Sequence, residues 1–148
     1  MNNLEISIKK LHEDARVPQL AHATDAGADL YSTDEVILQP GERVLISTGI
    51  AVALPEGYVG FVQPRSGLAI KHGISMVNTP GTIDAGYHGE IKVILINHDL
   101  HEPFTVLKGD RIAQFIIQRV ERPVFTEVDD LPETERGVSG FGSTGVQG

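Results

Sequence analysis

The sequence predicts an all-β protein, a sandwich or barrel with one short helix. Three observations lead to this prediction: runs rich in β-branched residues recur along the chain, turn signals containing Gly and Pro separate them, and only one short stretch has helical character. The 148 residues are enough for one domain with a core of its own, and 41% of them are hydrophobic. We find no internal repeat and no low-complexity tract, so we expect no second domain.

The expected elements follow one another from the N-terminus. Residues 4–9 alternate apolar and polar side chains, and residues 43–54 form a long β-branched run with Gly49 as a bulge or bend. Further strands are expected at residues 58–63, 91–97, 104–107 and 111–120. Turns are expected at residues 39–42, 55–57, 79–81 and 108–110. The one helix is predicted at residues 66–71, where His72 and Gly73 end it.

Two of the expected strands indicate an oligomer. Residues 91–97 are apolar on both faces apart from Lys92, and in residues 111–120 Gln114 and Gln118 share a face with apolar side chains. A strand that is covered on both sides needs a packing partner on each side, and a second subunit can supply one. The alternative is a central strand of a sandwich with loops over its outer face.

Composition narrows the possible partners and location. The formal net charge of -8 argues against non-specific binding of nucleic acid, which requires a basic face, but a few local cations could still bind a small anion. The chain has no Cys, so it has no disulfide framework, and its six His are scattered without the spacing of zinc ligands. No apolar run approaches the ~18 residues of a membrane span, and the N-terminus lacks a secretory signal. We therefore expect a soluble cytoplasmic protein with no membrane partner.

A phosphate-binding segment is predicted where a strand leads into the helix. Arg65 supplies a cation, Ser66 a hydroxyl, and Gly67 lets the backbone approach a ligand closely. The alternative is that Ser66 is a plain N-cap and Arg65 a surface residue.

Two carboxylates are candidates for chemistry. Residues 78–90 are predicted to form a β-hairpin with its tip at residues 84–87, where Asp84 could orient or deprotonate water beside the ring of Tyr87. Alternatively, Asp84 only forms the turn and Tyr87 only packs on the hairpin. Asp29, at the start of a strand, is either a turn carboxylate or an acid that holds an arginine or a metal-bound water.

The last 13 residues, 136–148, carry ligand-binding groups but no apolar period. They combine the cation of Arg136, the ring of Phe141 and the hydroxyls of Ser143 and Thr144 with glycines that expose backbone N–H groups. This composition suits a segment that closes over a phosphorylated ligand with a ring. The alternative is a disordered tail.

Taken in order, five segments resemble the motifs of the trimeric dUTP pyrophosphatases (dUTPases). The segments are residues 26–30, 64–68, 78–89, 109–114 and 136–145, so the resemblance covers nearly the whole chain. It implies a jelly-roll-like β domain over residues 1–131 that carries a nucleotide site. It also implies that residues 132–148 form a mobile arm that closes the site, and that the protein is a homotrimer whose active sites are shared between subunits.

The resemblance further implies a reaction and a role for each site residue. Water attacks the α-phosphate of dUTP in line and gives dUMP and pyrophosphate, which supplies dUMP for dTTP synthesis and keeps uracil out of DNA. Mg2+ is expected on the substrate phosphates and water, with no direct protein ligand. By this resemblance Asp84 activates the water, Asp29 is a supporting acid and Tyr87 lies under the deoxyribose. The nucleoside is held by Asn78, Thr82, Ile83 and Lys92, and the phosphates are held by Arg65, Ser66, Gly67 and Gln114. The arm contributes Arg136, Phe141, Gly142, Ser143 and Thr144, with Phe141 over uracil.

Two other functions are compatible with the same fold. One is a dCTP deaminase, or a bifunctional dCTP deaminase and dUTPase, which would release ammonia. The other is a non-catalytic β-sandwich module that binds the nucleotide without turning it over, because fold alone does not determine function.

Overall fold

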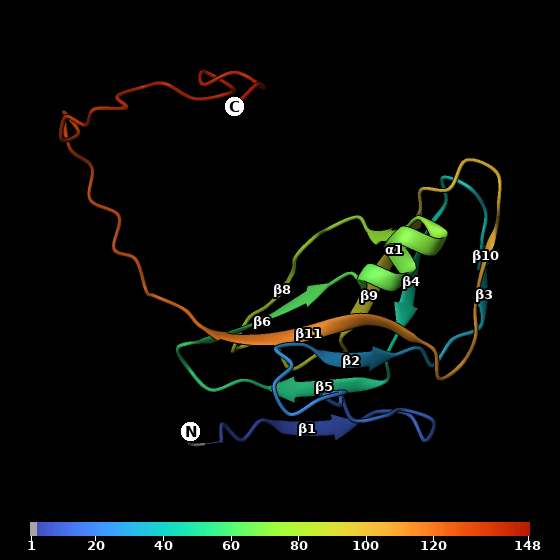
Figure 1. The fold of residues 1–148 in the computed structure, drawn as a ribbon. Helices are drawn as coiled ribbons and strands as arrows, with labels where there is room; N and C mark the ends of the chain where they lie inside the picture. Colours follow the sequence, from blue (N-terminus) through green and yellow to red (C-terminus); the bar gives the residue numbers. More distant parts are fainter. Residues whose placement is uncertain (1–2) are drawn as a thin grey trace.

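The structure is a computed structural model, and it describes residues 3–148. Within these residues there are eleven strands and a single helix, which confirms the all-β prediction (Figure 1). The strands are β1 (Ser7–Lys10), β2 (Ala28–Tyr31), β3 (Val36–Leu38), β4 (Arg43–Ser47), β5 (Ile50–Ala53), β6 (Tyr58–Gln63), β7 (Ile74–Met76), β8 (Gly81–Ile83), β9 (Lys92–Asn97), β10 (Phe104–Val106) and β11 (Arg111–Arg119). The helix is α1 (Ser66–His72).

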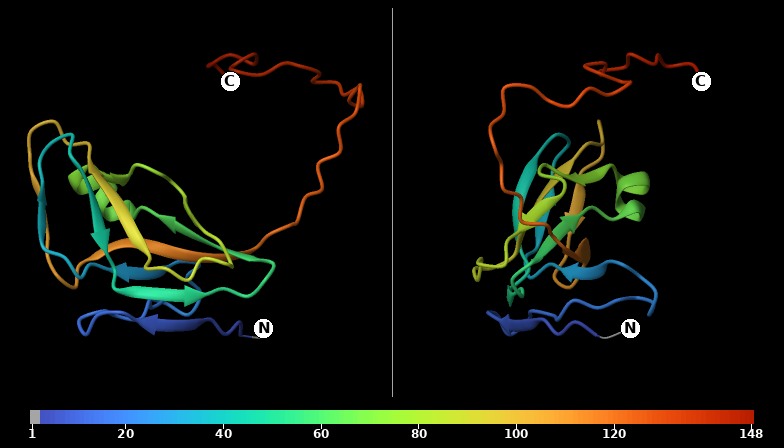
Figure 2. Two further views of the ribbon diagram at one scale, coloured as in Figure 1. Left: turned by 180° about the vertical axis from the view of Figure 1, so that it is seen from behind. Right: turned by 90° about the vertical axis from the view of Figure 1, so that its left-hand side faces the viewer.

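The strands form four antiparallel sheets around one core. The largest sheet has the order β2-β11-β6-β8, a second has the order β4-β9-β7, and the pairs β1-β5 and β10-β3 complete the set. Two further views show the sheets wrapping around a common interior (Figure 2). That interior is filled by fully buried apolar side chains from both larger sheets, such as Leu30 of β2, Ile46 of β4 and Leu95 of β9.

The prediction of one long strand over residues 43–54 is wrong, although the bend expected at Gly49 is confirmed. The chain breaks at Gly49, which has a φ of 69°, and β4 pairs with β9 whereas β5 pairs with β1. A Cβ at Gly49 would lie 2.9 Å from the Cβ of Ala15, so both the backbone conformation and the space require glycine there. The break lets one apolar run serve two different sheets. The first strand also begins later than expected, at Ser7.

The prediction of a β-hairpin over residues 78–90 is also wrong. A turn is present, because the Tyr87 N–H donates to the Asp84 carbonyl at 3.0 Å. However, β8 pairs with β6, and β9 pairs with β4 and β7, so the two sides of the turn belong to different sheets. The alternation rule cannot reveal this, because the pairing partners of both strands lie far away in the sequence.

The helix prediction is confirmed to within one residue. The chain leaves α1 through Gly73, which has a φ of 67° and whose N–H bonds the carbonyls of Leu68 and Ala69. The N-cap is Arg65 and not Ser66, and no side chain caps this end. The interpretation of Ser66 as a plain N-cap is therefore wrong.

The C-terminal segment lies apart from the sheets. No helix or strand is present between residues 120 and 148, and this segment projects away from the β domain beyond the end of β11 (Figure 1). Its apolar side chains Val124 and Phe125 are about nine-tenths exposed, at 90% and 91%. In the described part of the chain, no helix has the length and apolar character needed to cross a membrane.

Candidate active site

A polar pocket of about 310 Å³ lies where β2, β11 and the start of α1 meet. Strand pairing creates it from distant parts of the sequence, because β11 lies between β2 and β6 and places Gln114 opposite both Asp29 and Gln63. Arg65 follows Gln63 by two residues. The lining residues are Ala21, Asp25, Ala26, Gly27, Asp29, Arg65, Ser66, Gly67 and Gln114. We call this cavity the Arg65 pocket.

Two arginines surround the carboxylate of Asp29. Arg65 Nε lies 3.1 Å from Asp29 Oδ1, and Arg111 Nη1 lies 3.7 Å from Asp29 Oδ2. The Asp29 side chain is only 13% exposed, so these charge-assisted contacts are partly shielded from water. The contacts fix the direction of the Arg65 guanidinium and leave some of its five donors for a ligand. The part of Asp29 in catalysis stays a prediction.

Gln114 is held in one orientation by the segment before α1. Its Nε2 donates to the Pro64 carbonyl at 2.9 Å. A Cβ at Gly27 would overlap the Gln114 amide, so the absence of a side chain at Gly27 leaves room for that amide. Sequence reasoning did not name Gly27, Ala21 or Asp25 as site residues. Gly27 directly precedes β2 and Gln114 lies in β11, so their contact depends on how these two strands pair. In the sequence, the one sign of a role for Gly27 is that it belongs to the segment of residues 26–30.

Asp84 and Tyr87 lie together on the turn that joins β8 to β9. Asp84 is exposed, and the Tyr87 hydroxyl donates to the Glu90 carbonyl at 2.8 Å. A Cβ at Gly89 would lie 2.7 Å from Cζ of Tyr87, so the ring lies directly against the backbone at Gly89. The turn is therefore fixed at both ends while the carboxylate of Asp84 remains accessible. We call residues 78–90 the Asp84 turn.

Three of the other residues expected around the nucleoside belong to the Asp84 turn, and the fourth, Lys92, follows it. Asn78 is exposed before β8, with Nδ2 3.4 Å from the position of a Cβ on Gly81. Thr82 and Ile83 lie in β8, and Lys92 opens β9 with an exposed side chain. None of these residues lines the Arg65 pocket.

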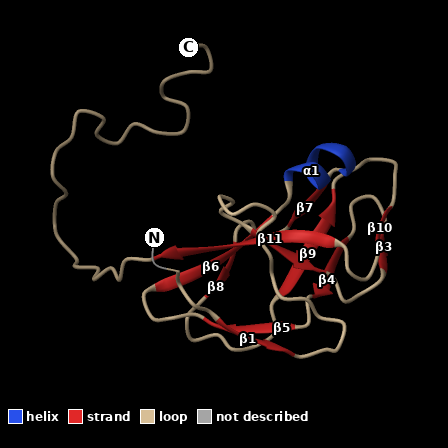
Figure 3. Ribbon diagram, turned by 60° about the horizontal axis from the view of Figure 1, so that its bottom comes forward, coloured by secondary structure: helices blue, strands red, loops and turns tan. Residues whose placement is uncertain are grey.

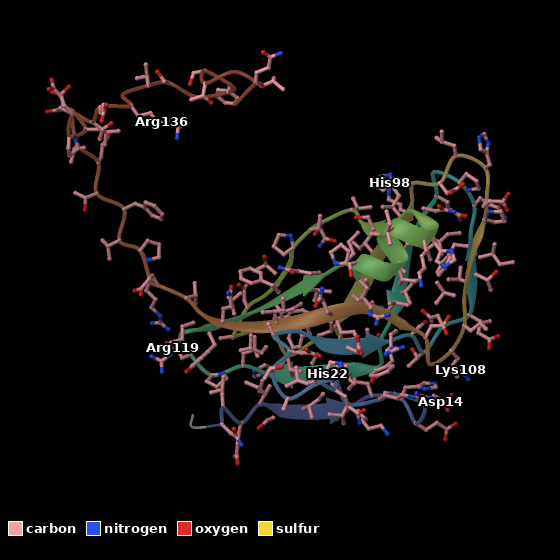
Figure 4. The ribbon with its side chains drawn as sticks, viewed as in Figure 1. Asp14, His22, His98, Lys108, Arg119 and Arg136 are labelled. Carbon is pink, nitrogen blue, oxygen red and sulfur yellow. The ribbon has the colours of Figure 1, made fainter. Side chains whose placement is uncertain are left out.

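The predicted arm residues form a third group, away from both others. Arg136 Nε donates to the Ser139 carbonyl at 2.8 Å, and its side chain lies far from the sheets (Figure 4). Phe141 is fully exposed, and Gly142, Ser143 and Thr144 follow it in a turn. In a single chain the predicted site residues thus occur in three places: the Arg65 pocket, the Asp84 turn and the arm.

Within residues 3–148, no group of three His, Cys, Asp or Glu side chains is arranged to hold a metal ion. The two carboxylates of the Arg65 pocket already have partners. Asp25 accepts from the His22 N–H at 2.8 Å, and Asp29 contacts the arginines.

Comparison with known proteins identifies the same family that the sequence motifs resemble. The model of the dUTPase family matches residues 13–145. The deoxyuridine 5'-triphosphate nucleotidohydrolase of Nocardia farcinica is 59% identical over 95% of this chain and 85% of its own length. That of Thermobifida fusca is 56% identical over 96% of this chain and 79% of its own length.

Solved structures agree with the sequence comparison. A mutant dUTPase of Staphylococcus bacteriophage 80alpha, solved with dUpNHpp, superposes with a TM-score of 0.89 at 33% identity and covers 97% of this chain and 100% of its own. A mutant dUTPase from phage phi11 of S. aureus, described with a structural Mg(II) ion, gives a TM-score of 0.82 at 30% identity over 88% of this chain and 100% of its own. The jelly-roll-like fold that the resemblance implied is the fold of these neighbours. The family match covers most of the chain and includes all three groups of site residues. The chain belongs to the dUTPase family.

Proposed function

We propose that this chain hydrolyses dUTP to dUMP and pyrophosphate. The observation that carries the proposal is the continuous family match over residues 13–145, which includes the Arg65 pocket, the Asp84 turn and nearly all of the arm. The relatives described above are named for the same hydrolysis. They give no support to the alternative of a dCTP deaminase.

The Arg65 pocket is proposed to bind the phosphates. Arg65 and the amide of Gln114 face it with donors, and Gly67 has open space where a Cβ would stand, so a phosphate oxygen can approach the backbone. Ser66 adds a hydroxyl at the first residue of α1. Because Asp29 already orients Arg65, the cation needs little rearrangement when a triphosphate arrives.

Asp84 is proposed to activate the attacking water. Its carboxylate is exposed on a fixed turn, which is what a base needs in order to hold water in line with the α-phosphorus. Tyr87 is proposed to pack under the deoxyribose, where its ring leaves no room for a ribose hydroxyl. Asn78 and the backbone of Thr82, Ile83 and Lys92 are proposed to pair with uracil, and fixed backbone groups discriminate strongly against cytosine.

Mg2+ is proposed to arrive with the triphosphate. When bound, it neutralises charge on the phosphate oxygens and the departing pyrophosphate. The residues fit this mode of binding, because the carboxylates of the Arg65 pocket already have protein partners and Mg2+ readily keeps its waters.

The protein is proposed to act as a homotrimer with shared active sites. The single chain does not gather its three groups of site residues, and the arm extends away from its own β domain (Figure 1). In the proposed assembly, residues 132–148 of one subunit close over a site formed by others, so that Phe141 covers uracil and Arg136, Gly142, Ser143 and Thr144 contact the phosphates. A cytoplasmic location remains part of this proposal.

One assay tests the activity. The protein is incubated with each deoxynucleoside triphosphate in the presence and absence of Mg2+, and pyrophosphate and ammonia are measured. We expect pyrophosphate from dUTP alone, lost when the metal is chelated. Ammonia from dCTP would overturn the assignment in favour of a deaminase, and tight dUTP binding without turnover would favour a non-catalytic module.

A further inference from the structure

Thr48 is a buried polar residue at the break between β4 and β5. It is 1% exposed, and it lies where the chain leaves the sheet of β4 and β9 and enters the pair β1-β5 (Figure 3). Its hydroxyl donates to the carbonyl of Ile91, which directly precedes β9. A buried hydroxyl is destabilising unless it has a partner, and here the partner lies at the end of the Asp84 turn.

The break between β4 and β5 holds Ile91 from two sides. The pairing of β9 with β4 ends at Lys92, so Ile91 lies just beyond the ladder. Ile91 is fully buried, and its N–H donates to the Ile50 carbonyl at 2.8 Å. Thr48 and Ile50 therefore bond the two main-chain polar groups of Ile91. Without the Thr48 hydroxyl, the buried carbonyl of Ile91 loses this donor.

The same stretch of main chain holds the ring of Tyr87. The Glu90 carbonyl belongs to the peptide unit whose N–H is that of Ile91, and it accepts from the Tyr87 hydroxyl at 2.8 Å. A movement of the main chain at Ile91 therefore moves the acceptor of the Tyr87 hydroxyl as well. Hydrogen bonds and peptide units thus connect Thr48, in the core, with Tyr87, which is 45% exposed.

We propose that Thr48 is a positioning residue that fixes the ring of Tyr87 and thereby sets the preference for deoxyribose over ribose. The inference rests on the proposed function, in which this ring packs under the deoxyribose and leaves no room for a ribose hydroxyl. A site that rejects a ligand by a clash needs a wall that does not yield. The bond of the Tyr87 hydroxyl is exposed to water, whereas that of Thr48 is buried and supplies the fixed end.

The first test compares the hydrolysis of dUTP and UTP by variants of residue 48. Thr48→Val keeps the shape of the side chain but removes the hydroxyl, whereas Thr48→Ser keeps the hydroxyl. Thr33→Val is the matched control, because the half-buried Thr33 donates to the Ser47 carbonyl at 3.1 Å, beside the same break, and not to the Asp84 turn.

The readout is the ratio of kcat/KM for dUTP to kcat/KM for UTP. We expect this ratio to fall by about 10-fold or more in Thr48→Val and to stay within about 2-fold of the wild type in Thr48→Ser and Thr33→Val. A general loss of stability lowers both activities together and leaves the ratio unchanged. An unchanged ratio in Thr48→Val, or an equal fall in Thr33→Val, would overturn the proposal.

A second measurement does not depend on catalysis. Amide hydrogen exchange is followed at Ile91 and at Tyr87, whose N–H donates to the Asp84 carbonyl at 3.0 Å. Amides of β11 serve as the reference, because a general loss of stability speeds exchange there too. We expect Thr48→Val to speed exchange at Ile91 and Tyr87 by about 10-fold relative to β11, and Thr33→Val to leave this relation unchanged. Equal acceleration at all of these amides would contradict the proposal.

Thr48→Cys takes the place of Thr48→Val if the valine variant does not fold. A thiol is small but only a weak donor, so we expect the same changes in selectivity and exchange to a smaller extent, and their absence would contradict the proposal. Faster exchange at Tyr87 in a wild-type background that hydrolyses no dUTP would contradict only the proposed function. A wild type that hydrolyses dUTP, with unchanged selectivity and exchange in the Thr48 variants, would contradict only this inference.

Discussion

Asp84 combines exposure with a fixed position, and both properties suit its proposed role in activating water. The backbone bond from Tyr87 and the contact of the Tyr87 ring with Gly89 hold the turn, so a change of the carboxylate to an amide keeps the shape. We predict that Asp84→Asn binds dUTP but lowers kcat by roughly 10² to 10⁴, the usual contribution of a general base. Steady-state hydrolysis and calorimetric binding measure the two effects. Glu35→Gln, an exposed carboxylate outside the site, is the control, and a near-native rate for Asp84→Asn would remove Asp84 from the mechanism.

Asp29 is expected to act through Arg65. Asp29→Asn keeps the size of the side chain but removes the charge that orients Arg65 Nε at 3.1 Å. We predict that kcat/KM for dUTP falls by about 10-fold or more, as for other residues that orient a ligand-binding group. The double variant Asp29→Asn/Arg65→Lys is compared with each of the two single variants. If Asp29 works through Arg65, the loss of kcat/KM in the double variant is smaller than the combined losses of the single variants. Fully additive losses would show that Asp29 acts independently.

At the level of elements, length decides what the sequence can predict. The strands β6, β9 and β11 have six or more residues, enough to show their pattern, and all three were predicted. Strands of three residues are too short to display a period of two, and β3 and β7 were not predicted, whereas the equally short β10 was predicted because the turn signal at residues 108–110 marks its end. The residue types of the Arg65 pocket were predictable because Arg65, Ser66 and Gly67 are contiguous. The contact of Gly27 with Gln114 depends on strand register, which local sequence does not specify.

The break between β4 and β5 leads to a prediction about glycine. Gly49 and Gly41 both have positive φ, at 69° and 79°, but only Gly49 is crowded, with Ala15 Cβ 2.9 Å from the position of its own Cβ. Gly41→Ala should lower the free energy of unfolding by about 1 to 2 kcal/mol, the cost of a left-handed conformation for alanine. Gly49→Ala should lower it by a further 1 to 3 kcal/mol or so, because the added methyl group overpacks its surroundings. Urea titration measures both, and equal losses would show that the Ala15 contact relaxes freely.

For the molecule as a whole, the arm lies away from the β domain in the single chain, although its proposed role is to close over an active site. Residues 136–148 project away from the β domain, so their deletion removes no core contact (Figure 1). We predict that the truncated chain keeps its oligomeric mass and thermal midpoint but loses turnover by about 10² or more, as when a transition-state donor is removed. Normal turnover by the truncated protein would exclude a catalytic role for the arm.

Two inactive chains should together restore activity if the sites are shared. The truncated chain keeps Asp84 but lacks the arm, and full-length Asp84→Asn keeps the arm but lacks the carboxylate. When equal amounts are unfolded together and refolded, random assembly fills the Asp84 position and the arm position of each site independently, so about a quarter of the sites receive both intact parts. The matched control mixes the truncated chain with a truncated Asp84→Asn chain, which assembles in the same way but supplies no arm. Because activity can return only if Asp84 and the arm of one site come from different chains, a mixture as inactive as its control would place each active site within a single subunit.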